Sequence, residues 1–259
     1  MVTGIPMTAG AGALQAADVL TRADVLTRAD VLTRADVLTR SDDLVIRIDG
    51  TRPLSAEAVA AVGALCDSTE DCGGHRQVIV HVSGAPAAAS AGDLAITLVS
   101  RWERGLRRLE RLPATTIAIA TGDCGGLALD ALLATDYRIA ATSVRLLVPV
   151  EAGATWPGMA LYRLSRRSGA TAIRRAVLFG TPIEATEALA LCLVDELADD
   201  VVTALAAATE LTGAVSGAEL AIRRQLMLDA ATVSFEDALG RHLAACDRVL
   251  RQASARATP

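Results

Sequence analysis

Residues 114–140 constrain the fold most, because they combine a predicted strand, a tight turn, a helix and a second strand without interruption. Residues 115–120 form a short apolar run rich in β-branched side chains, which predicts a buried strand. Gly122, Gly125 and Gly126 then allow a sharp turn, and the helix follows at once. This order of elements predicts an α/β fold with its chemistry at the turn.

The start of the predicted helix is the candidate functional site. A first helical turn has backbone N–H groups without intrahelical partners and carries the positive end of the helix dipole. A developing negative oxygen would therefore be stabilised beside residues 126–128. Asp130 follows within one turn, and helical side chains tilt toward the N-terminus. The pattern thus brings hydrogen-bond donors and a possible base together.

This stretch has two other interpretations besides the catalytic one. A glycine turn that feeds a core helix, with Asp130 only complementing the dipole, explains the pattern equally well. A dinucleotide-binding loop is disfavoured, because the glycines at 122, 125 and 126 do not have the G-x-G-x-x-G spacing.

Composition limits the class of protein. With 52% hydrophobic and 21% charged residues among 259, the chain can bury a sizeable core as one domain with appendages. Aromatic residues make up only 2%, and the formal net charge is −5. Both values argue against a nucleic-acid partner. No apolar run approaches the roughly 20 residues that a membrane helix needs, so no membrane partner is expected.

Cysteine and histidine usage argues against disulfides and metals. The five cysteines are scattered and contain no CxxC pair, so reduced thiols in a cytoplasmic protein are expected. The three histidines show no ligand spacing, and no metal site is expected. His81 ends a valine-rich strand and is expected to be a packed core residue rather than a catalytic base.

The N-terminal region is repetitive. Residues 17–40 are four tandem copies of Ala-Asp-Val-Leu-Thr-Arg. A six-residue period matches neither 3.6 nor a sustained heptad, so a helix formed from it would have no constant apolar face. We expect 1–41 to be a mobile or loosely helical leader outside the fold, with a repeat-mediated contact as the alternative.

The rest of the chain divides into two regions. Strands are predicted at 44–48 and 77–82, with a helix capped by Ser55 between them. A second helix, with a capping box from Ser90 and Asp93, carries an apolar stripe and five arginines that form either a solvated face or an anion contact. From residue 201 only helices are predicted. These patterns predict an α/β core at 42–198 and a helical region at 199–259.

Residues 122–140, which end in Asp-Tyr-Arg-Ile-Ala, resemble the signature of the crotonase (enoyl-CoA hydratase/isomerase) family. The resemblance continues through Trp-Pro-Gly at 156–158 and the stretch 178–194, and it covers about 44–198. It implies a spiral of ββα units with a C-terminal helical oligomerisation region, and assembly as a homotrimer or hexamer. It also implies an acyl-CoA thioester substrate, held by two backbone N–H groups, and no permanently bound cofactor.

The resemblance assigns positions to the two oxyanion donors and to the first acid. The donors correspond to Leu127 and to Gly92 or Asp93, and Asp130 stands where hydratases have their first catalytic glutamate.

The second catalytic glutamate of the family is missing. Its place is taken by Val150, and Glu151 lies one position further on. A slip of one residue in a strand turns the side chain to the other face, so Glu151 is a weak candidate for the second carboxylate.

Within the family, the stretches 99–103, 153–158 and 221–227 are most similar to the crotonase-like accessory proteins of 3,5-dihydroxyphenylglycine biosynthesis, a glycopeptide antibiotic precursor pathway. That similarity implies a hydro-lyase that works beside a type III polyketide synthase and other crotonase-like proteins. It would promote dehydration and aromatisation of a CoA-bound polyketide to 3,5-dihydroxyphenylacetyl-CoA. The alternatives are a non-catalytic binding partner of the synthase and a generic enoyl-CoA hydratase/isomerase.

Overall fold

The computed structural model describes residues 38–40, 43–73, 76–87, 94–151, 153–213 and 217–257. Most of the stretch expected to be a leader, 1–37 and 41–42, lies outside these residues. Its last described part, Leu38–Arg40, forms strand β1, which pairs antiparallel with β2 (Asp43–Asp49). This strand therefore precedes the domain boundary expected at residue 42.

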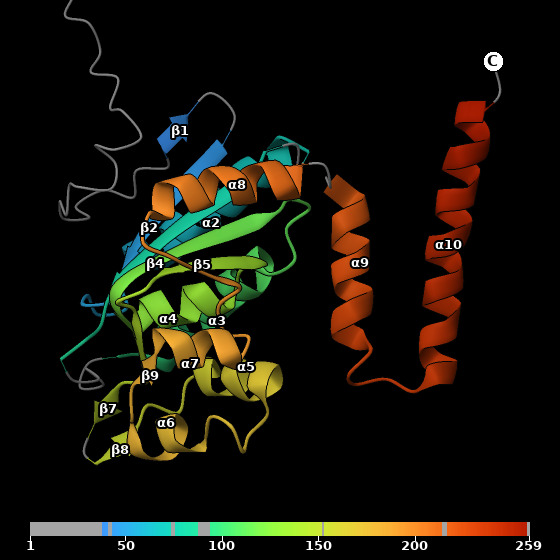
Figure 1. Cartoon of the computed structure of the whole chain (residues 1–259). Coiled ribbons are helices and arrows are strands. Elements are labelled where there is room, and N and C mark those ends of the chain that lie inside the picture. The colour runs from blue at the N-terminus through green and yellow to red at the C-terminus, as the bar shows by residue number, and fades with distance from the viewer. Residues whose placement is uncertain are drawn as a thin grey trace, which may run out of the picture. The chain divides into compact units, whose positions relative to one another are not determined.

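A central sheet with strand order β1-β2-β3-β4-β5-β10 organises the fold (Figure 1). All neighbours from β2 to β10 are parallel. The remaining strands on this path are β3 (Val78–Gly84), β4 (Thr116–Gly125), β5 (Tyr137–Ala141) and β10 (Glu196–Ala198). The strands expected at 44–48, 77–82 and 115–120 are confirmed, and so is the α/β class.

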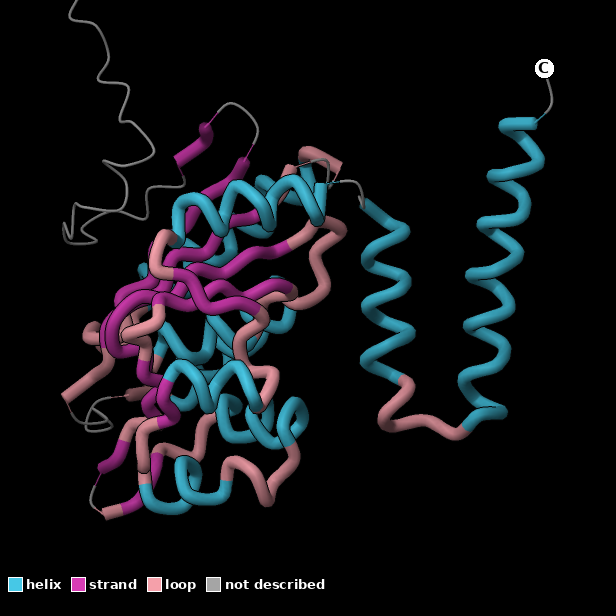
Figure 2. Tube along the Cα trace, viewed as in Figure 1, coloured by secondary structure: helices cyan, strands magenta, loops and turns pink. Residues whose placement is uncertain are grey.

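Helices cover both faces of this sheet (Figure 2). Side chains that alternate along β3 go to opposite faces: Val78, Val80 and Val82 join the core that contains α2 (Ala56–Asp71), α3 (Ile96–Leu109) and α4 (Leu127–Leu133). Ile79 instead packs with α8 (Val201–Gly213). Burial on both faces explains why the strands are apolar almost throughout.

The helix starts agree only in part with expectation. Ser55 is the N-cap of α2, and its Oγ accepts a hydrogen bond from the Ala58 N–H at 3.3 Å. Helix α3 instead begins at Ile96, with Ala95 at the N-cap and no side-chain cap. Because Ala95 is the N-cap, the capping box expected from Ser90 and Asp93, which lie outside the described residues, does not start α3.

The second half of the chain adds small elements and the helical tail. β6 (Arg145–Leu147) pairs with the end of β4 and with β9 (Ile183–Glu184), and β7 (Val150–Glu151) and β8 (Ala154–Thr155) form a hairpin. Helices α5 (Met159–Ser168), α6 (Arg174–Phe179) and α7 (Ala185–Ala190) follow.

The three expected C-terminal helices are present as α8, α9 (Gly217–Asp229) and α10 (Phe235–Ala257). Within the described part of the chain, no single helix is long and apolar enough to cross a bilayer. Helices α8 and α9 meet that criterion only as a pair, across a bend of 95°.

Candidate active site

The glycine-rich stretch does not turn where the sequence predicted. Strand β4 continues through Gly122, which has φ of +63°, and ends at Gly125. Before Gly122 the strand pairs with β5, and after it the strand pairs with β6. The positive φ thus bends the strand toward a new partner instead of ending it. The sharp turn comes at Gly126 (φ +53°, ψ −128°), the N-cap of α4.

Three strand ends meet closely in front of this turn. A Cβ atom added to Gly50 would lie 2.2 Å from the carbonyl oxygens of both Gly84 and Gly125. A Cβ on Gly125 would lie 2.8 Å from the Cβ of Ala85. Only glycine fits at these positions, so the backbone itself surrounds the start of α4.

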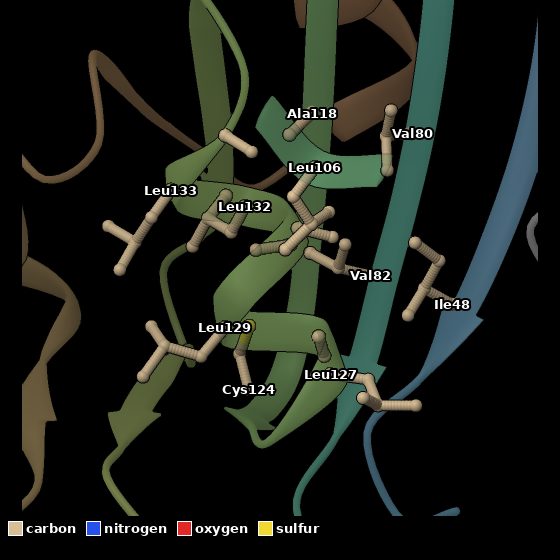
Figure 3. Close-up of a cluster of buried hydrophobic side chains, with 14 of the residues drawn as sticks. Ile48, Val80, Val82, Leu106, Ala118, Cys124, Leu127, Leu129, Leu132 and Leu133 are labelled. Atoms are coloured by element: carbon tan, nitrogen blue, oxygen red, sulfur yellow. The ribbon is translucent and has the colours of Figure 1, made fainter. Parts of the chain in front are cut away.

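Helix α4 is anchored by its side chains, nearly all of which are buried. Leu127 is 8% exposed and belongs to the buried cluster around α4 that Figure 3 shows, together with Ile48 and Val82. The N–H groups of Leu127 and Ala128 have no partner within the helix, as for any helix start. Gly92 and Asp93, the expected positions of the other donor, lie outside the described residues.

Asp130 lies one turn into α4, as predicted. Its N–H donates to the Gly126 carbonyl at 3.0 Å, and its Oδ2 accepts a hydrogen bond from the Trp102 indole Nε1 at 3.1 Å. Part of the residue remains accessible, but loss of solvent around the carboxyl is the main cause that raises its pKa from 3.8 to about 7. The charge of Glu103 raises the pKa further, while the Trp102 hydrogen bond and Arg163 oppose both.

A pKa near 7 gives Asp130 both protonation states at neutral pH. A carboxyl of this kind can remove a proton from a bound molecule and return it, which is what general acid–base catalysis requires. The strongly shifted pKa favours a chemical role over the alternative that Asp130 only complements the helix dipole.

Glu103 and Arg163 form a buried ion pair beside Asp130. Arg163 on α5 is 7% exposed, and it donates to Glu103 at 2.9 Å and to Glu110 at 2.7 Å, both on or next to α3. Burial disfavours the Arg163 cation, but the two carboxylates keep its pKa above the usual value. No local sequence pattern indicates that these residues act on Asp130.

The position of the missing second glutamate lies in the β7–β8 hairpin. Val150 is 41% exposed, and a Cβ on Gly180 at the end of α6 would lie 2.3 Å from its Cγ2. Val150 therefore packs over Gly180. The backbone of Glu151 pairs with Ala154 in the hairpin, and its side chain lies outside the described residues. Glu151 thus stays a prediction.

The signature Asp-Tyr-Arg-Ile-Ala has a structural task. The Asp136 Oδ2 accepts from the Thr116 N–H and hydroxyl, both at 3.0 Å, and from Arg224 on α9 at 2.6 Å. Arg138 donates to Asp195 at 2.9 Å and ties β5 to the start of β10. These residues join strands and helices to one another and take no part in the site.

His81 does not belong to the site. It alternates with the valines that face α4, so it lies on the α8 face of β3. Burial and the charge of Arg47 lower its pKa to about 4, which keeps it neutral, in agreement with a packed residue. No group of three or more His, Cys, Asp or Glu side chains suited to a metal occurs in the described ranges.

The arginines on α3 were expected to form either a solvated face or a contact with an anion. Arg108 makes a two-bond contact with Glu70, and Arg107 pairs with Glu110 at 2.7 Å. These ion pairs agree with a solvated face. A cleft of about 680 Å³ lies among α3, α5 and α9 and is lined by Arg107, but Asp130 is not among its lining residues.

Comparison with known proteins agrees with this geometry. Residues 85–256 match the family described as enoyl-CoA hydratase/isomerase. A protein of Amycolatopsis orientalis named enoyl-CoA-hydratase is 53% identical over 210 residues, which cover 81% of this chain and 97% of that protein.

Crystal structures show the same fold. An enoyl-CoA hydratase/isomerase of Marinobacter aquaeolei has a TM-score of 0.69 at 20% identity and covers 86% of this chain and 90% of its own. An enoyl-CoA hydratase of Mycobacterium smegmatis has a TM-score of 0.70 at 17% identity, with coverage of 83% and 91%. The chain belongs to the enoyl-CoA hydratase/isomerase family.

Proposed function

We propose that this protein binds an acyl-CoA thioester and catalyses proton transfer at the carbon next to the thioester carbonyl. The observation that carries the proposal is the placement of Asp130, with a pKa of about 7, one turn behind the N–H groups at the start of α4 that have no partner within the helix. In this proposal the Leu127 N–H and a donor at Gly92 or Asp93 hold the thioester oxygen. No permanently bound cofactor is needed.

One carboxyl suffices for loss of water in this scheme. Ionised Asp130 takes the proton next to the carbonyl, and the two N–H donors stabilise the enolate that forms. The enolate then expels the hydroxyl group at the next carbon, which leaves as water when Asp130 transfers the same proton to it. A pKa near neutrality suits both steps. Val150 replaces the second glutamate, so addition or loss of water relies on Asp130, with Glu151 as the weaker second candidate.

We further propose that the thioester is a polyketide and that the product is 3,5-dihydroxyphenylacetyl-CoA, formed beside a type III polyketide synthase and other crotonase-like proteins. One contact supports this finer assignment. The stretch 99–103, on which the similarity to the dihydroxyphenylglycine proteins depends, contains Trp102 and Glu103, and these are the α3 residues that act on Asp130. A non-catalytic partner of the synthase would have no need for that arrangement.

We propose that the helical region 199–259 assembles the protein as a homotrimer or hexamer. Helix α10 supports this, because its large apolar side chains at 235, 239, 243 and 250 are 41–74% exposed in a single chain. Light scattering at micromolar concentration should report three or six copies, and a monomer would remove the proposal.

Proton exchange tests the proposed chemistry directly. The protein is incubated with butyryl-CoA in D₂O, and deuterium incorporation next to the carbonyl is followed by mass spectrometry. Asp130→Asn should slow exchange by about 10²- to 10⁴-fold. Asp123→Asn is the matched control, since Asp123 lies on the same stretch but pairs on the surface with Arg145 at 2.7 Å. Equal exchange by both folded variants would contradict the proposal.

A second assay separates the finer assignment from the binding-partner alternative. Formation of dihydroxyphenylacetyl product by a type III polyketide synthase is measured with wild type and with Asp130→Asn. Loss of stimulation only with the variant supports catalysis. Full stimulation by the folded variant would favour a partner without chemistry.

A further inference from the structure

Trp102 is a buried residue of α3 whose indole reaches Asp130 on α4. It is 2% exposed and packs in the same core as Leu106 and Leu109. Its indole N–H is directed at one atom, the Oδ2 of Asp130, at 3.1 Å. Within the described part of the chain, no other side chain or N–H group donates to this carboxyl. One carboxyl oxygen is therefore held, and the other is left for another partner.

We infer that Trp102 is a positioning residue for Asp130: its indole N–H holds Oδ2 and so presents Oδ1 to the substrate as the atom that takes and returns the proton. This inference rests on the proposed function of Asp130. Trp102 itself does not touch the reacting atoms.

The rigidity of the indole explains how the positioning works. The terminal torsion of an aspartate is broad, so a carboxyl with no partner turns freely about it. Trp102 is fixed by the core on all sides, and its hydrogen bond restricts that torsion to one orientation. A reacting group held in one orientation reacts faster than one that must be ordered first.

The groups around Asp130 predict whether each substitution should raise or lower the pKa of its carboxyl. On α3, the Trp102 hydrogen bond favours the ionised carboxyl and the charge of Glu103 disfavours it; on α5, Arg163 favours it. On β4, burial raises the pKa of the Cys124 thiol, and the nearby Asp130 charge raises it further. Strands β2 and β3 contribute apolar side chains to α4, among them Ile48, Val80 and Val82 (Figure 3).

The indole signals test the contact without any assay of turnover. The chain has two tryptophans, so a ¹H–¹⁵N spectrum shows two indole resonances, from Trp102 and Trp156. The Trp102 resonance, assigned by its loss in Trp102→Phe, should shift with pH as Asp130 ionises. In Asp130→Asn this shift should disappear, while the Trp156 resonance serves as the internal control. A Trp102 resonance that does not respond to Asp130 would overturn the inference.

The pH dependence of proton exchange tests the functional part. Trp102→Phe should move the rising limb of the pH profile of kcat to higher pH by about one unit. It should also lower kcat at pH 7 by roughly 3- to 10-fold, with KM little changed. Glu103→Gln should move the limb to lower pH, because it removes a negative charge and leaves Arg163 less neutralised. Trp156→Phe should leave the limb in place.

These outcomes separate the inference from the proposed function. Opposite shifts for Trp102→Phe and Glu103→Gln support the positioning role, because loss of packing alone would not move the two limbs in opposite directions. If Glu103→Gln moves the limb but Trp102→Phe leaves both limb and kcat unchanged, the inference is wrong and the role of Asp130 stands. If no form of the protein exchanges protons, the proposed function fails, while the indole titration still decides whether Trp102 reports the ionisation of Asp130.

Discussion

Asp130 lies one turn into α4, and Asp136 follows six residues later, just beyond the C-terminal end of the helix; the fold holds the two carboxylates in different ways. Asp136 accepts three hydrogen bonds at its Oδ2, from the N–H and hydroxyl of Thr116 and from Arg224. Asp130 accepts one among the described residues, from Trp102. A carboxylate with several donors fixes the chain, whereas one with few donors in a desolvated position keeps a proton that it can exchange.

The same short helix connects these two carboxyl groups. Its apolar side chains, with Leu132 and Leu133 among them, are buried in the core and hold it against the sheet (Figure 3). The chain just after its C-terminal end is tied to β4 and α9 through Asp136, and its N-terminal end directly follows the turn at Gly126. The buried side chains and the hydrogen bonds of Asp136 thus hold the helix that carries Asp130, as expected for a functional group on a well-supported element.

The largest effect on stability should come from Asp136. Asp136→Asn leaves the Arg224 guanidinium, on a residue only 7% exposed, without its carboxylate. Loss of one partner of a buried ion pair costs about 3 kcal/mol when the remaining partner stays partly hydrogen-bonded, as Arg224 does to Leu112 and Ala114. Urea denaturation at fixed protein concentration measures the change.

The double variant Asp136→Asn/Arg224→Met sharpens this prediction. It removes the unpaired charge together with its partner and should recover part of the lost stability. No recovery would mean that Arg224 contributes through its contacts with the carbonyls rather than through the ion pair.

Asp130→Asn should raise the stability of the protein, in contrast to the loss expected for Asp136→Asn. The folded pKa of Asp130 lies above its unfolded value, so the folded state binds the proton more tightly. The free energy of unfolding of the wild type therefore falls as pH rises from about 4 to about 7 and changes no further from this group above that. The amide in Asp130→Asn is neutral at every pH, so the variant does not lose this free energy of unfolding. Asp130→Asn should thus gain roughly 1–3 kcal/mol over wild type between pH 4 and pH 8.

Thermal or urea unfolding at both pH values measures this gain. A gain that does not depend on pH would show that the carboxyl of Asp130 is not strained by its surroundings, and the contrast with Asp136 would disappear.

A substitution at Cys192, which lies outside the site in a strained backbone conformation, should change the stability by a smaller amount. This residue follows α7 and has φ of +56°, a left-handed conformation that favours glycine. Cys192→Gly should stabilise the protein by about 0.5 kcal/mol, because relief of about 1 kcal/mol of strain is partly offset by the greater freedom of unfolded glycine. Cys192→Ala keeps the strain and is the control. Equal stabilities of the two variants would contradict this origin.

Local patterns predicted much of the fold and one central residue. The β-branched run at 115–120, the Ser55 cap and the helix that begins after Gly126 follow from sequence periodicity and capping, and the structure has all three. Asp130 could be singled out because its relation to the turn is also local. The end of β4 was misplaced, because a glycine with positive φ can bend a strand without ending it.

The surroundings of Asp130 could not be predicted in this way. Trp102 belongs to the apolar stripe of α3, but its partner is 28 residues away, and the contact depends on how distant elements pack together. Arg163 and Glu103 are 60 residues apart, and nothing in either local pattern indicates their pairing. Sequence periodicity identifies which face of a helix is buried, but not which polar atom on that face meets which partner.

The pH dependence of kcat/KM for proton exchange from butyryl-CoA tests the role of Asp130 most directly. If ionised Asp130 is the base, the rate should rise about tenfold per pH unit below pH 7 and become constant above it, since kcat/KM reports ionisation of the free enzyme. Residual exchange by Asp130→Asn should lack this limb. A wild-type rate that is constant from pH 5.5 to 8.5 would contradict the assignment of Asp130 as the proton-transfer group.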